Sequence, residues 1–326
     1  MSLTSTFRTS LNKLRYLQLT DFILTTSFHT GITIVHILLS NCYQRNVSLI
    51  FDDMAIDKLT LNSILTEQNI IESKFLNRNV RIDAYLPVNI EQPEQMSLLL
   101  INDGQDLPKM PFDEILDSLI SHNLIEPLVC IGIHCGHDRK MEYGVAAERD
   151  YKGRGAKAAL YTQFIFEELL PFIHNTYRVR SFKEKAFAGF SLGALSALDI
   201  VWNHPKQFTK AGLFSGSFWW RNKSYKEGYS DANDRIMHNQ IKNGKYHPSL
   251  KFFFECGALD ETHDRNHNGI IDSIDDTLDL IKELKSKRYT DEAIEYLQLE
   301  DGKHDVPTWA IAFPYFLKWG WGKKSL

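Results

Sequence analysis

The stretch Lys185-Ala-Phe-Ala-Gly-Phe-Ser-Leu-Gly-Ala-Leu-Ser-Ala-Leu198 decides the fold of this chain. It reads as a short apolar strand over residues 186–188, then a Gly-Phe-Ser-Leu-Gly turn, then a helix rich in Ala and Leu. A G-x-S-x-G turn between a strand and a helix is the pattern of a nucleophile elbow, in which the serine occupies a strained turn. Glycine is required on both sides because a side chain at Gly189 or Gly193 would collide with the neighbouring strand or helix. The alternative is a tight turn whose Ser191 only caps the helix.

The elbow also explains what the serine can do. Its turn lifts the Ser191 hydroxyl clear of the sheet, beside a helix N-terminus where free N–H groups and the helix dipole favour negative charge. We therefore interpret Ser191 as a nucleophile that attacks an acyl carbonyl. The N–H of Leu192 and one from the loop at residues 102–106 are expected to hold the oxyanion.

Composition sets the broad class. A chain of 326 residues with 43% hydrophobic residues can bury a sizeable core. The net charge of -4 leaves no basic footprint, which argues against a nucleic-acid partner. The four scattered cysteines do not form a disulfide framework. The first residues lack the apolar core of a signal peptide, and the apolar run at residues 32–39 is too short to span a membrane. We expect a cytoplasmic protein without a membrane partner, although a chain whose signal had been removed would read the same.

Strand-like and helix-like segments alternate from residue 71 onward. Continuous apolar runs indicate buried parallel strands, and apolar residues at helical spacing indicate the helices between them. Residues 79–87 alternate between apolar and polar and end at a proline, which indicates an early antiparallel strand. The other strands are expected at residues 96–101, 128–134, 186–188, 210–215, 250–256 and 295–299. The helices are expected at residues 112–123, 161–177 with a kink at Pro171, after the elbow up to about residue 204, 275–288 and 308–319. This alternation predicts an α/β domain at residues 71–326 with a mainly parallel central sheet flanked by helices. Residues 1–70 are harder to interpret and are expected to be an extension packed on that domain.

The acid and base of a catalytic triad are expected after the elbow, in the order Ser, Asp or Glu, His. Functional groups gather beyond the carboxyl ends of parallel strands. Asp260 follows the strand at 250–256, and His304 follows the strand at 295–299. We interpret His304 as the general base and Asp260 as the acid that orients it, with Glu261 and Asp264 as neighbours that could substitute for Asp260. His134 and His137 are lower-ranked alternatives for the base.

A second motif lies just downstream of Asp260. The segment Asp264-Arg-Asn-His-Asn-Gly-Ile-Ile-Asp-Ser-Ile-Asp275 has the ligand spacing of an EF-hand calcium loop, with Gly269 at the sharp turn. The expected oxygen ligands are Asp264, Asn266, Asn268, the Ile270 carbonyl, Asp272 and Asp275. Position 12 is Asp where the usual bidentate residue is Glu, and no helix precedes the loop. We expect a structural Ca²⁺ that rigidifies the acid loop, and no organic cofactor; the alternative is an Asx-rich turn that caps the helix at Asp275.

Several motifs together resemble the esterase family that includes enterochelin esterases and S-formylglutathione hydrolase. The resemblance covers residues 72–322. It is carried by Leu98-Leu-Leu-Ile-Asn-Asp-Gly-Gln-Asp106, Arg139-Lys-Met-Glu-Tyr143, Phe164-x-x-Glu-Glu-Leu-x-Pro171, Gly189-Phe-Ser-Leu-Gly193, Phe214-Ser-Gly-Ser-Phe-Trp-Trp220 and Gly302-Lys-His-Asp-Val-Pro-Thr-Trp309. It implies an α/β-hydrolase fold without a large lid, and hydrolysis of a carboxylic ester of small-molecule size.

The resemblance also implies roles for particular residues. By motif position, Ser191 is the nucleophile, His304 the base and Asp260 the acid. Gln105 would supply the second oxyanion N–H. Arg139 and Glu142 match positions that shape the substrate site in relatives, where the alternative is a surface ion pair. The tryptophans Trp219, Trp220 and Trp309 would line an aromatic pocket or lie in the core.

Two features depart from the family. The first seventy residues do not resemble the binding domain that precedes some siderophore esterases, and the calcium-like insert is not a general family feature. The sequence therefore indicates an ester without singling out a siderophore. The leading hypothesis is a serine esterase; the alternatives are an acyltransferase on the same triad and a non-catalytic protein that binds in a Ca²⁺-dependent manner.

Overall fold

The computed structural model describes residues 26–29, 32–35, 63–88 and 93–323. The chain divides into two units, Met1–Leu61 and Asn62–Leu326. In the first unit the described residues form two short antiparallel strands, β1 (Thr26–His29) and β2 (Ile32–Val35). The expected packing of residues 1–70 on the main domain falls largely outside the described residues and stays a prediction.

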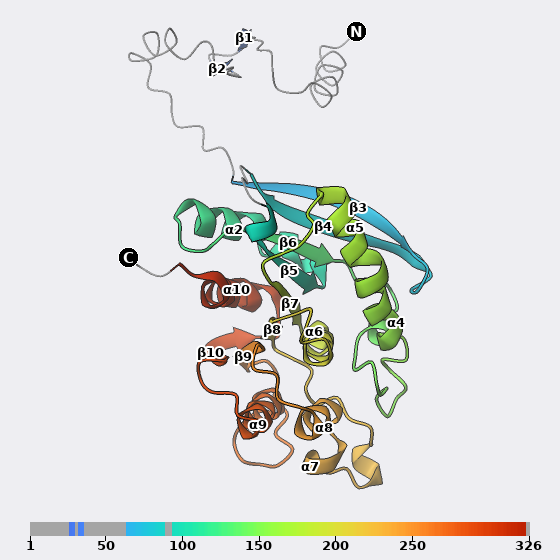
Figure 1. The fold of residues 1–326 in the computed structure, drawn as a ribbon. Helices are drawn as coiled ribbons and strands as arrows, with labels where there is room; N and C mark the ends of the chain where they lie inside the picture. The colour runs from blue at the N-terminus through green and yellow to red at the C-terminus, as the bar shows by residue number, and fades with distance from the viewer. Residues whose placement is uncertain (1–25, 30–31, 36–62, 89–92, 324–326) are drawn as a thin grey trace. The chain divides into compact units, whose positions relative to one another are not determined.

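The second unit is organised around an eight-stranded sheet of order β10-β9-β8-β7-β5-β6-β4-β3 (Figure 1). Its strands are β3 (Ile64–Ser73), β4 (Arg78–Pro87), β5 (Ser97–Asn102), β6 (Leu128–Ile133), β7 (Lys185–Phe190), β8 (Lys210–Phe214), β9 (Lys251–Leu259) and β10 (Ile294–Lys303). From β6 to β10 the neighbouring strands pair in parallel, whereas β4 is antiparallel to both β3 and β6. The mainly parallel sheet was predicted. Strand β3 was not, and it begins before the expected domain boundary at residue 71.

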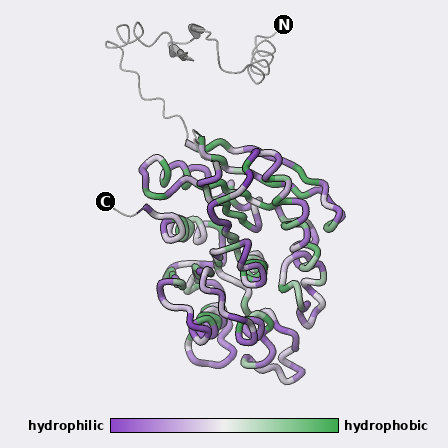
Figure 2. The backbone as a smooth tube through the Cα atoms, viewed as in Figure 1, coloured by the Kyte–Doolittle hydropathy of each residue, from purple (hydrophilic) through white to green (hydrophobic). Residues whose placement is uncertain are grey.

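Helices cover both faces of this sheet. They are η1 (Pro93–Gln95), η2 (Gly104–Lys109), α2 (Phe112–Ser121), α3 (Arg139–Glu142), α4 (Ala158–Gln163), η3 (Phe164–Leu169), α5 (Leu170–Tyr177), α6 (Leu192–Asn203), η4 (Tyr225–Glu227), α7 (Asp231–Asp234), α8 (Ile236–Asn243), α9 (Asp272–Ser286) and α10 (Val306–Trp321). One apolar cluster joins the sheet to η3, α5, α6, α8 and α9, and a second joins it to α2 and α10. In Figure 2 the hydrophobic, green stretches of the backbone run through the central strands and also through the helices beside them.

The burial of the strands explains why they were readable in the sequence. Every residue of β5, β6 and β8 is buried, so these strands appear as continuous apolar runs. Helix α6 packs directly behind the elbow, and its first eleven residues, from Leu192 to Trp202, are all buried. The sheet and α6 thus hold the elbow from both sides.

Two helices differ in detail from the prediction. The helix expected at residues 161–177 starts at Ala158, and a π-helical turn, η3, precedes Pro171. Proline lacks an N–H donor, so the hydrogen-bond pattern is interrupted there. The helix expected to begin at Asp275 begins at Asp272, with Ile271 as its N-cap, so Asp275 lies in the first turn and does not cap it.

Candidate active site

The elbow has the strained geometry that the motif predicts. Ser191 has φ 55° and ψ -119°, a conformation that residues with a side chain rarely adopt. A methyl group at Gly189 would lie 2.5 Å from the Gly193 backbone, and one at Gly193 would lie 2.6 Å from Asp103 Oδ2. Both glycines are therefore required by close packing of strand, helix and neighbouring loop.

Ser191, the predicted nucleophile, lies at the start of α6, where the first N–H groups of a helix have no partner within it. Among the described residues, the hydrogen-bond partner of the Ser191 hydroxyl is Ser217, with 3.3 Å between the two Oγ atoms. The backbone of the same loop is also tied to the elbow, because Ser217 N donates to Ser191 O at 3.1 Å. The loop after β8 thus contacts the predicted nucleophile directly.

The predicted acid and base lie together at the carboxyl ends of β9 and β10. His304 Nδ1 is 3.9 Å from Asp260 Oδ1, which is an ionic contact longer than a hydrogen bond. The Asp260 side chain is fully buried, whereas that of His304 is 40% exposed. Trp309 packs edge-on against His304, with 5.5 Å between ring centroids. The structure therefore brings the predicted pair to one place, with the imidazole open to solvent.

Burial shifts the ionisation of both groups. It raises the pKa of Asp260 to about 6, while a hydrogen bond from Ser215 acts in the opposite direction. Burial lowers the pKa of His304, so the neutral form that can accept a proton is favoured. Asp260 is mostly ionised at neutral pH, and His304 is mostly neutral.

A small network surrounds the acid. The Ser215 hydroxyl donates to Asp260 Oδ1 at 3.1 Å, and Trp309 Nε1 donates to Ser215 Oγ at 3.0 Å. Glu255, a buried residue of β9, places Oε2 3.5 Å from the same hydroxyl. Ser215 itself has φ 45°, so the turn after β8 is strained as the elbow is.

The loop after β5 faces the elbow from the other side. Asp103 adopts a left-handed conformation with φ 59° and begins η2, which places Gln105 in the first turn. The carboxylate of Asp103 accepts two hydrogen bonds of 2.7 Å from Arg139. Gln105 Oε1 accepts from Cys135 N at 3.1 Å, and its side chain therefore ties the loop to the end of β6.

Arg139 and Glu142 do not pair with each other. Arg139 binds Asp103 and also donates to Phe190 O at 3.3 Å, beside the elbow. Glu142 is 1% exposed, and both of its carboxylate oxygens accept from Arg78, at 2.8 and 2.7 Å. The two residues lie in separate ion pairs, and Arg139 links the loop after β5 to the end of β7, directly before Ser191.

The three tryptophans are placed differently. Trp220 is fully buried and Trp309 is 7% exposed, so both belong to the core. Trp219 lines a hollow of about 330 Å³ beside the acid loop. Its other lining residues are Arg221, Tyr225, Glu261, His263, Asp264, Arg265 and Asp272.

His134 belongs to a different pair. Its Nε2 lies 2.7 Å from the buried carboxylate of Asp83, which also accepts from Arg81. His137 has a side chain that is 87% exposed. Of the three histidines considered as the general base, His304 is the one that lies beside Asp260.

The calcium-like loop is closed by its own hydrogen bonds. Asp264 accepts from the N–H groups of Asn268 and Gly269, at 3.2 and 2.9 Å. The amides of Asn266 and Asn268 both donate to Asp275 Oδ2 at 2.8 Å. Asp272 is turned inward, where its Oδ1 accepts from the Arg265 N–H at 2.8 Å. Ile270 donates its N–H to Asn268 Oδ1.

Carboxylate, histidine and cysteine side chains do not converge on a metal position anywhere in the described ranges. In the calcium-like loop, the predicted ligands Asp264 and Asp275 accept hydrogen bonds from N–H donors. Oxygen donors nevertheless stand at the expected positions of the loop, and Gly269 has the positive φ, 89°, that the sharp turn requires.

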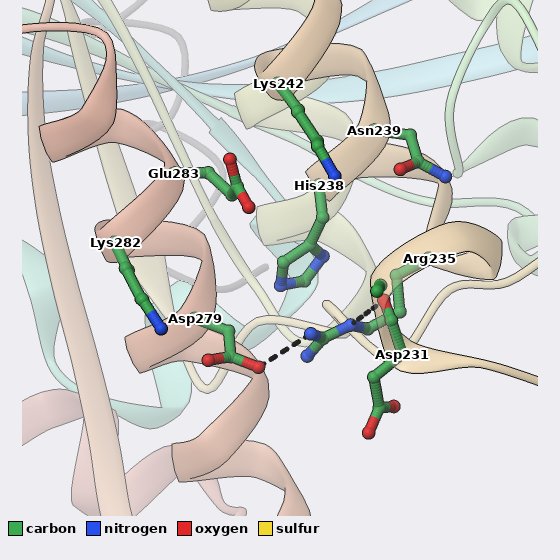
Figure 3. A pocket seen from close by; sticks show the side chains of 9 residues that line it. Asp231, Arg235, His238, Asn239, Lys242, Asp279, Lys282 and Glu283 are labelled. Carbon is green, nitrogen blue, oxygen red and sulfur yellow. Dashed lines mark hydrogen bonds and ion pairs between the residues drawn. The ribbon is translucent and has the colours of Figure 1, made fainter.

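A second pocket, of about 230 Å³, lies between α8 and α9 (Figure 3). Its lining residues are Asp231, Ala232, Arg235, His238, Asn239, Lys242, Asp279, Lys282 and Glu283, none of which is a serine, threonine or cysteine. Arg235 is paired with Asp279 at 2.6 Å, as the figure shows, and burial lowers the pKa of His238 to about 3. Because its lining holds no hydroxyl or thiol side chain that could serve as a serine-type nucleophile, this pocket is not the candidate active site.

Several residues of the site were not predicted. Ser215 and Ser217 follow β8, so the strand-end rule that located Asp260 and His304 applies to them equally. Glu255 is the single acidic residue in the apolar run at residues 250–256, and a carboxylate inside such a run was a usable signal. Arg78 and Asp103 are visible only through their tertiary partners.

The family of this chain follows from residues 73–319, which match the model of the family described as "Putative esterase". The chain belongs to this esterase family. A relative, "Uncharacterized protein YbbA" of Bacillus subtilis, is 24% identical over 251 residues, which are 75% of this chain and 94% of that protein. The protein is therefore a carboxylic ester hydrolase of the serine hydrolase type.

Solved esterase structures share its fold. A ferulic acid esterase superposes with a TM-score of 0.59 at 17% identity and covers 78% of this chain and 97% of its own. The enterobactin esterase FES from Shigella flexneri has a TM-score of 0.59 at 22% identity, over 79% of this chain and 60% of that one. An IroE-like serine hydrolase from Shewanella oneidensis gives a TM-score of 0.59 at 15% identity, over 78% and 79% of the two chains.

These likenesses confirm the α/β-hydrolase fold. The esterase domain matches over nearly its full length in the ferulic acid esterase, whereas it spans 60% of the enterobactin esterase. Within the described ranges, the helices are too short or too polar to cross a membrane.

Proposed function

We propose that this esterase cleaves a small carboxylic ester through an acyl-enzyme, with Ser191 as nucleophile, His304 as general base and Asp260 as the acid that orients it. The observation that carries the proposal is the strained turn at Ser191, φ 55°, at the start of α6. The contact of 3.9 Å between His304 and Asp260 at the ends of β9 and β10 supports it. A capping serine would need neither the strain nor a histidine and carboxylate at the adjacent strand ends.

In this mechanism Ser191 Oγ attacks the acyl carbon while His304 Nε2 takes its proton. The N–H groups of Leu192 and Gln105 stabilise the oxyanion. The imidazolium then gives its proton to the leaving alcohol, and the C–O bond breaks. Water, deprotonated by His304, then attacks the acyl carbon, the bond to Ser191 Oγ breaks, and His304 returns the proton to Ser191 Oγ as the acid leaves.

Asp260 acts through His304. It must approach Nδ1 by about 1 Å to form a hydrogen bond, a movement expected when substrate binds, because catalytic hydrogen bonds are often long in free enzymes. The positive charge on His304 during the reaction favours this approach, since Asp260 carries the opposite charge.

Substrate is expected to enter beside Trp219, in the hollow of about 330 Å³ that borders the acid loop. Ser217 contacts Ser191 and lies two residues before Trp219, so the hollow is connected to the nucleophile through one loop. An aromatic wall favours an ester with an aryl or other apolar group. Arg139 and Glu142 are proposed to shape the site through the loops that they hold.

The test is covalent labelling by a fluorophosphonate probe, followed by intact mass, for the wild type and Ser191→Ala. We expect a single adduct on the wild type that is absent from the variant, together with turnover of p-nitrophenyl butyrate. Folded wild-type protein without an adduct, with and without added Ca²⁺, would mean that the serine is not activated and would favour a binding protein on this fold. Transfer of the acyl group to an added alcohol in preference to water would instead indicate an acyltransferase.

We further propose that the loop at residues 264–275 binds one Ca²⁺ with a structural role. The support is the spacing of oxygen donors at Asp264, Asn266, Asn268, the Ile270 carbonyl, Asp272 and Asp275, and the positive φ of Gly269 at position six. The loop begins four residues after Asp260, so an ion there would restrict the motion of the acid loop.

Calcium binding is tested by calorimetry on chelator-treated protein, for the wild type and Asp264→Ala. We expect binding by the wild type alone, and a higher melting temperature of the wild type in Ca²⁺, because a ligand that binds only the folded state stabilises it. Asp291→Ala, at a side chain that is 88% exposed and lies outside the loop, should bind Ca²⁺ as the wild type does. Wild-type protein that shows neither heat nor a thermal shift would contradict the proposal.

A further inference from the structure

A second carboxyl group lies behind the acid of the proposed triad. Glu255 is 1% exposed, and its Oε1 has no hydrogen-bond partner among the described residues. Its Oε2 lies 3.5 Å from Ser215 Oγ, and the same hydroxyl lies 3.1 Å from Asp260 Oδ1. One buried hydroxyl therefore connects two buried carboxyl groups.

The hydrogen count of Ser215 determines the direction of these contacts. A hydroxyl has one hydrogen and two lone pairs. Trp309 Nε1 donates to Ser215 Oγ at 3.0 Å and occupies one lone pair. The shorter carboxyl contact, with Asp260, takes the hydrogen. The remaining lone pair can only accept, so Glu255 fits there as a carboxylic acid that donates its own hydrogen.

We propose that Ser215 and Glu255 are positioning residues of this esterase: neutral Glu255 donates to Ser215, and Ser215 donates to Asp260, which keeps the single negative charge beside His304. This inference rests on the proposed function, because it specifies how the acid of that triad is held. Neither residue touches the reacting atoms; both act through Asp260.

The electrostatics of the two carboxyl groups agree with this order. Burial, and then the charge of Asp260, raise the pKa of Glu255 to about 8, so Glu255 keeps its proton at neutral pH. Burial raises the pKa of Asp260 only to about 6, and the hydrogen bond from Ser215 opposes the rise. The other titratable groups that act on Glu255, Asp260 or His304 are Cys256 and Tyr296 from β9 and β10, Glu261, Asp305 and Arg139.

The pH dependence follows from the proton count. Between about pH 6 and about pH 8 the pair carries one negative charge, on Asp260. Above about pH 8 Glu255 loses its proton, and two carboxylates compete for the single hydrogen of Ser215. Asp260 is then held less well, so turnover should fall on the alkaline side. Without the Ser215 hydroxyl the pKa of Asp260 rises, so the acid limb of the profile should move to higher pH.

The experiment measures kcat and KM for p-nitrophenyl butyrate against pH, for the wild type, Ser215→Ala and Glu255→Gln. We expect Ser215→Ala to lower kcat roughly 10- to 100-fold, the effect of losing a hydrogen bond to a charged group, with KM changed less than about twofold. Its acid limb should move to higher pH. Glu255→Gln cannot ionise, so the alkaline fall should disappear.

A matched control is Ser97→Ala. Ser97 is a buried serine at the opposite end of the sheet, where its hydroxyl donates to Glu184 Oε1 at 3.3 Å. The Ser97→Ala variant also loses a hydrogen bond from a serine to a carboxylate. This bond lies at the first residue of β5, at the end of the strand away from the elbow. Its pH profile should match that of the wild type, so a change confined to Ser215→Ala separates positioning from general destabilisation.

A second measurement does not depend on turnover: the infrared band of a protonated carboxyl group at neutral pH. We expect this band of Glu255 in the wild type and its loss in Glu255→Gln. This measurement decides the matter if Ser215→Ala does not fold. If the wild type labels with fluorophosphonate but the Ser215→Ala and Glu255→Gln profiles match Ser97→Ala, the inference is overturned and the proposed function stands. If the wild type does not label, both fall.

Discussion

The nucleophile and the acid–base pair of the proposed site are built in different ways. The nucleophile lies within five consecutive residues, 189–193, and its position is set by a strained backbone between β7 and α6. Asp260 and His304 come from loops after β9 and β10 and are 3.9 Å apart. They are held by side chains from other elements, among them Ser215 and Trp309.

The turn at Ser191 is therefore rigid, whereas the distance between His304 and Asp260 can adjust. The strain at Ser191 costs of order 1–3 kcal/mol and persists because the buried α6 leaves the turn no other conformation. A contact of 3.9 Å between a half-exposed imidazole and a buried carboxylate can shorten when charge develops. Substitutions at the elbow should therefore affect folding, whereas those in the acid–base loops should affect turnover and its pH dependence.

The largest effect is expected at His304. His304→Ala removes the general base and should lower kcat roughly 10⁴-fold or more, as removal of a triad histidine does in other serine hydrolases. His137→Ala, at a side chain that is 87% exposed, is the control and should retain wild-type kcat. Steady-state hydrolysis of p-nitrophenyl butyrate measures both. Comparable losses in the two variants would show that His304 has no special role.

The next effect tests which acid completes the pair. Asp260→Asn should lower kcat roughly 10³- to 10⁴-fold, because the amide cannot stabilise the imidazolium. Glu261→Gln replaces the adjacent acid, whose side chain is 29% exposed, and should change kcat by about twofold or less. The reverse order of the two effects would assign the acid to Glu261.

A third prediction concerns the stability of the elbow. Gly193→Ala places a methyl group 2.6 Å from Asp103 Oδ2 and 3.0 Å from Asn102 Cβ, and should lower the free energy of unfolding by about 3 kcal/mol. The control, Gly153→Ala, meets no atom within 4 Å and has φ 77°, so only backbone strain of about 1 kcal/mol is expected. Urea denaturation measures both. Equal losses would show that close packing does not explain Gly193.

The smallest effect is on the acid limb of kcat/KM. Burial lowers the pKa of His304, and the base acts in its neutral form, so the limb should lie below the ordinary histidine value of about 6.5. The nearby charge of Glu261 opposes this shift, so Glu261→Gln should move the limb to lower pH. A wild-type acid limb with an apparent pKa above the ordinary histidine value of about 6.5 would contradict this interpretation of the site.

Elements that the sequence did not predict, such as helix α8 and strand β3, depend on long-range contacts. Helix α8 was not predicted; its Ile236 and Ile241 pack in the same cluster as α6 and α9, a contact that no local pattern reveals. Strand β3 was also missed, since its burial pattern is mostly exposed and lacks a clear alternation. Both elements take their conformation from neighbours that are distant in the chain.

The sequence by itself determined the elbow, the mainly parallel α/β sheet and the strand ends on which Asp260 and His304 stand. These features follow from local rules: glycine at crowded turns, apolar runs in buried strands, and functional groups at strand ends. Only the tertiary structure decided that Arg139 binds Asp103, that Glu142 binds Arg78, and that Ser215 joins Glu255 to Asp260. Those contacts join side chains from separate elements, and a hydrogen bond depends on distances of a few tenths of an ångström that only the packed fold sets.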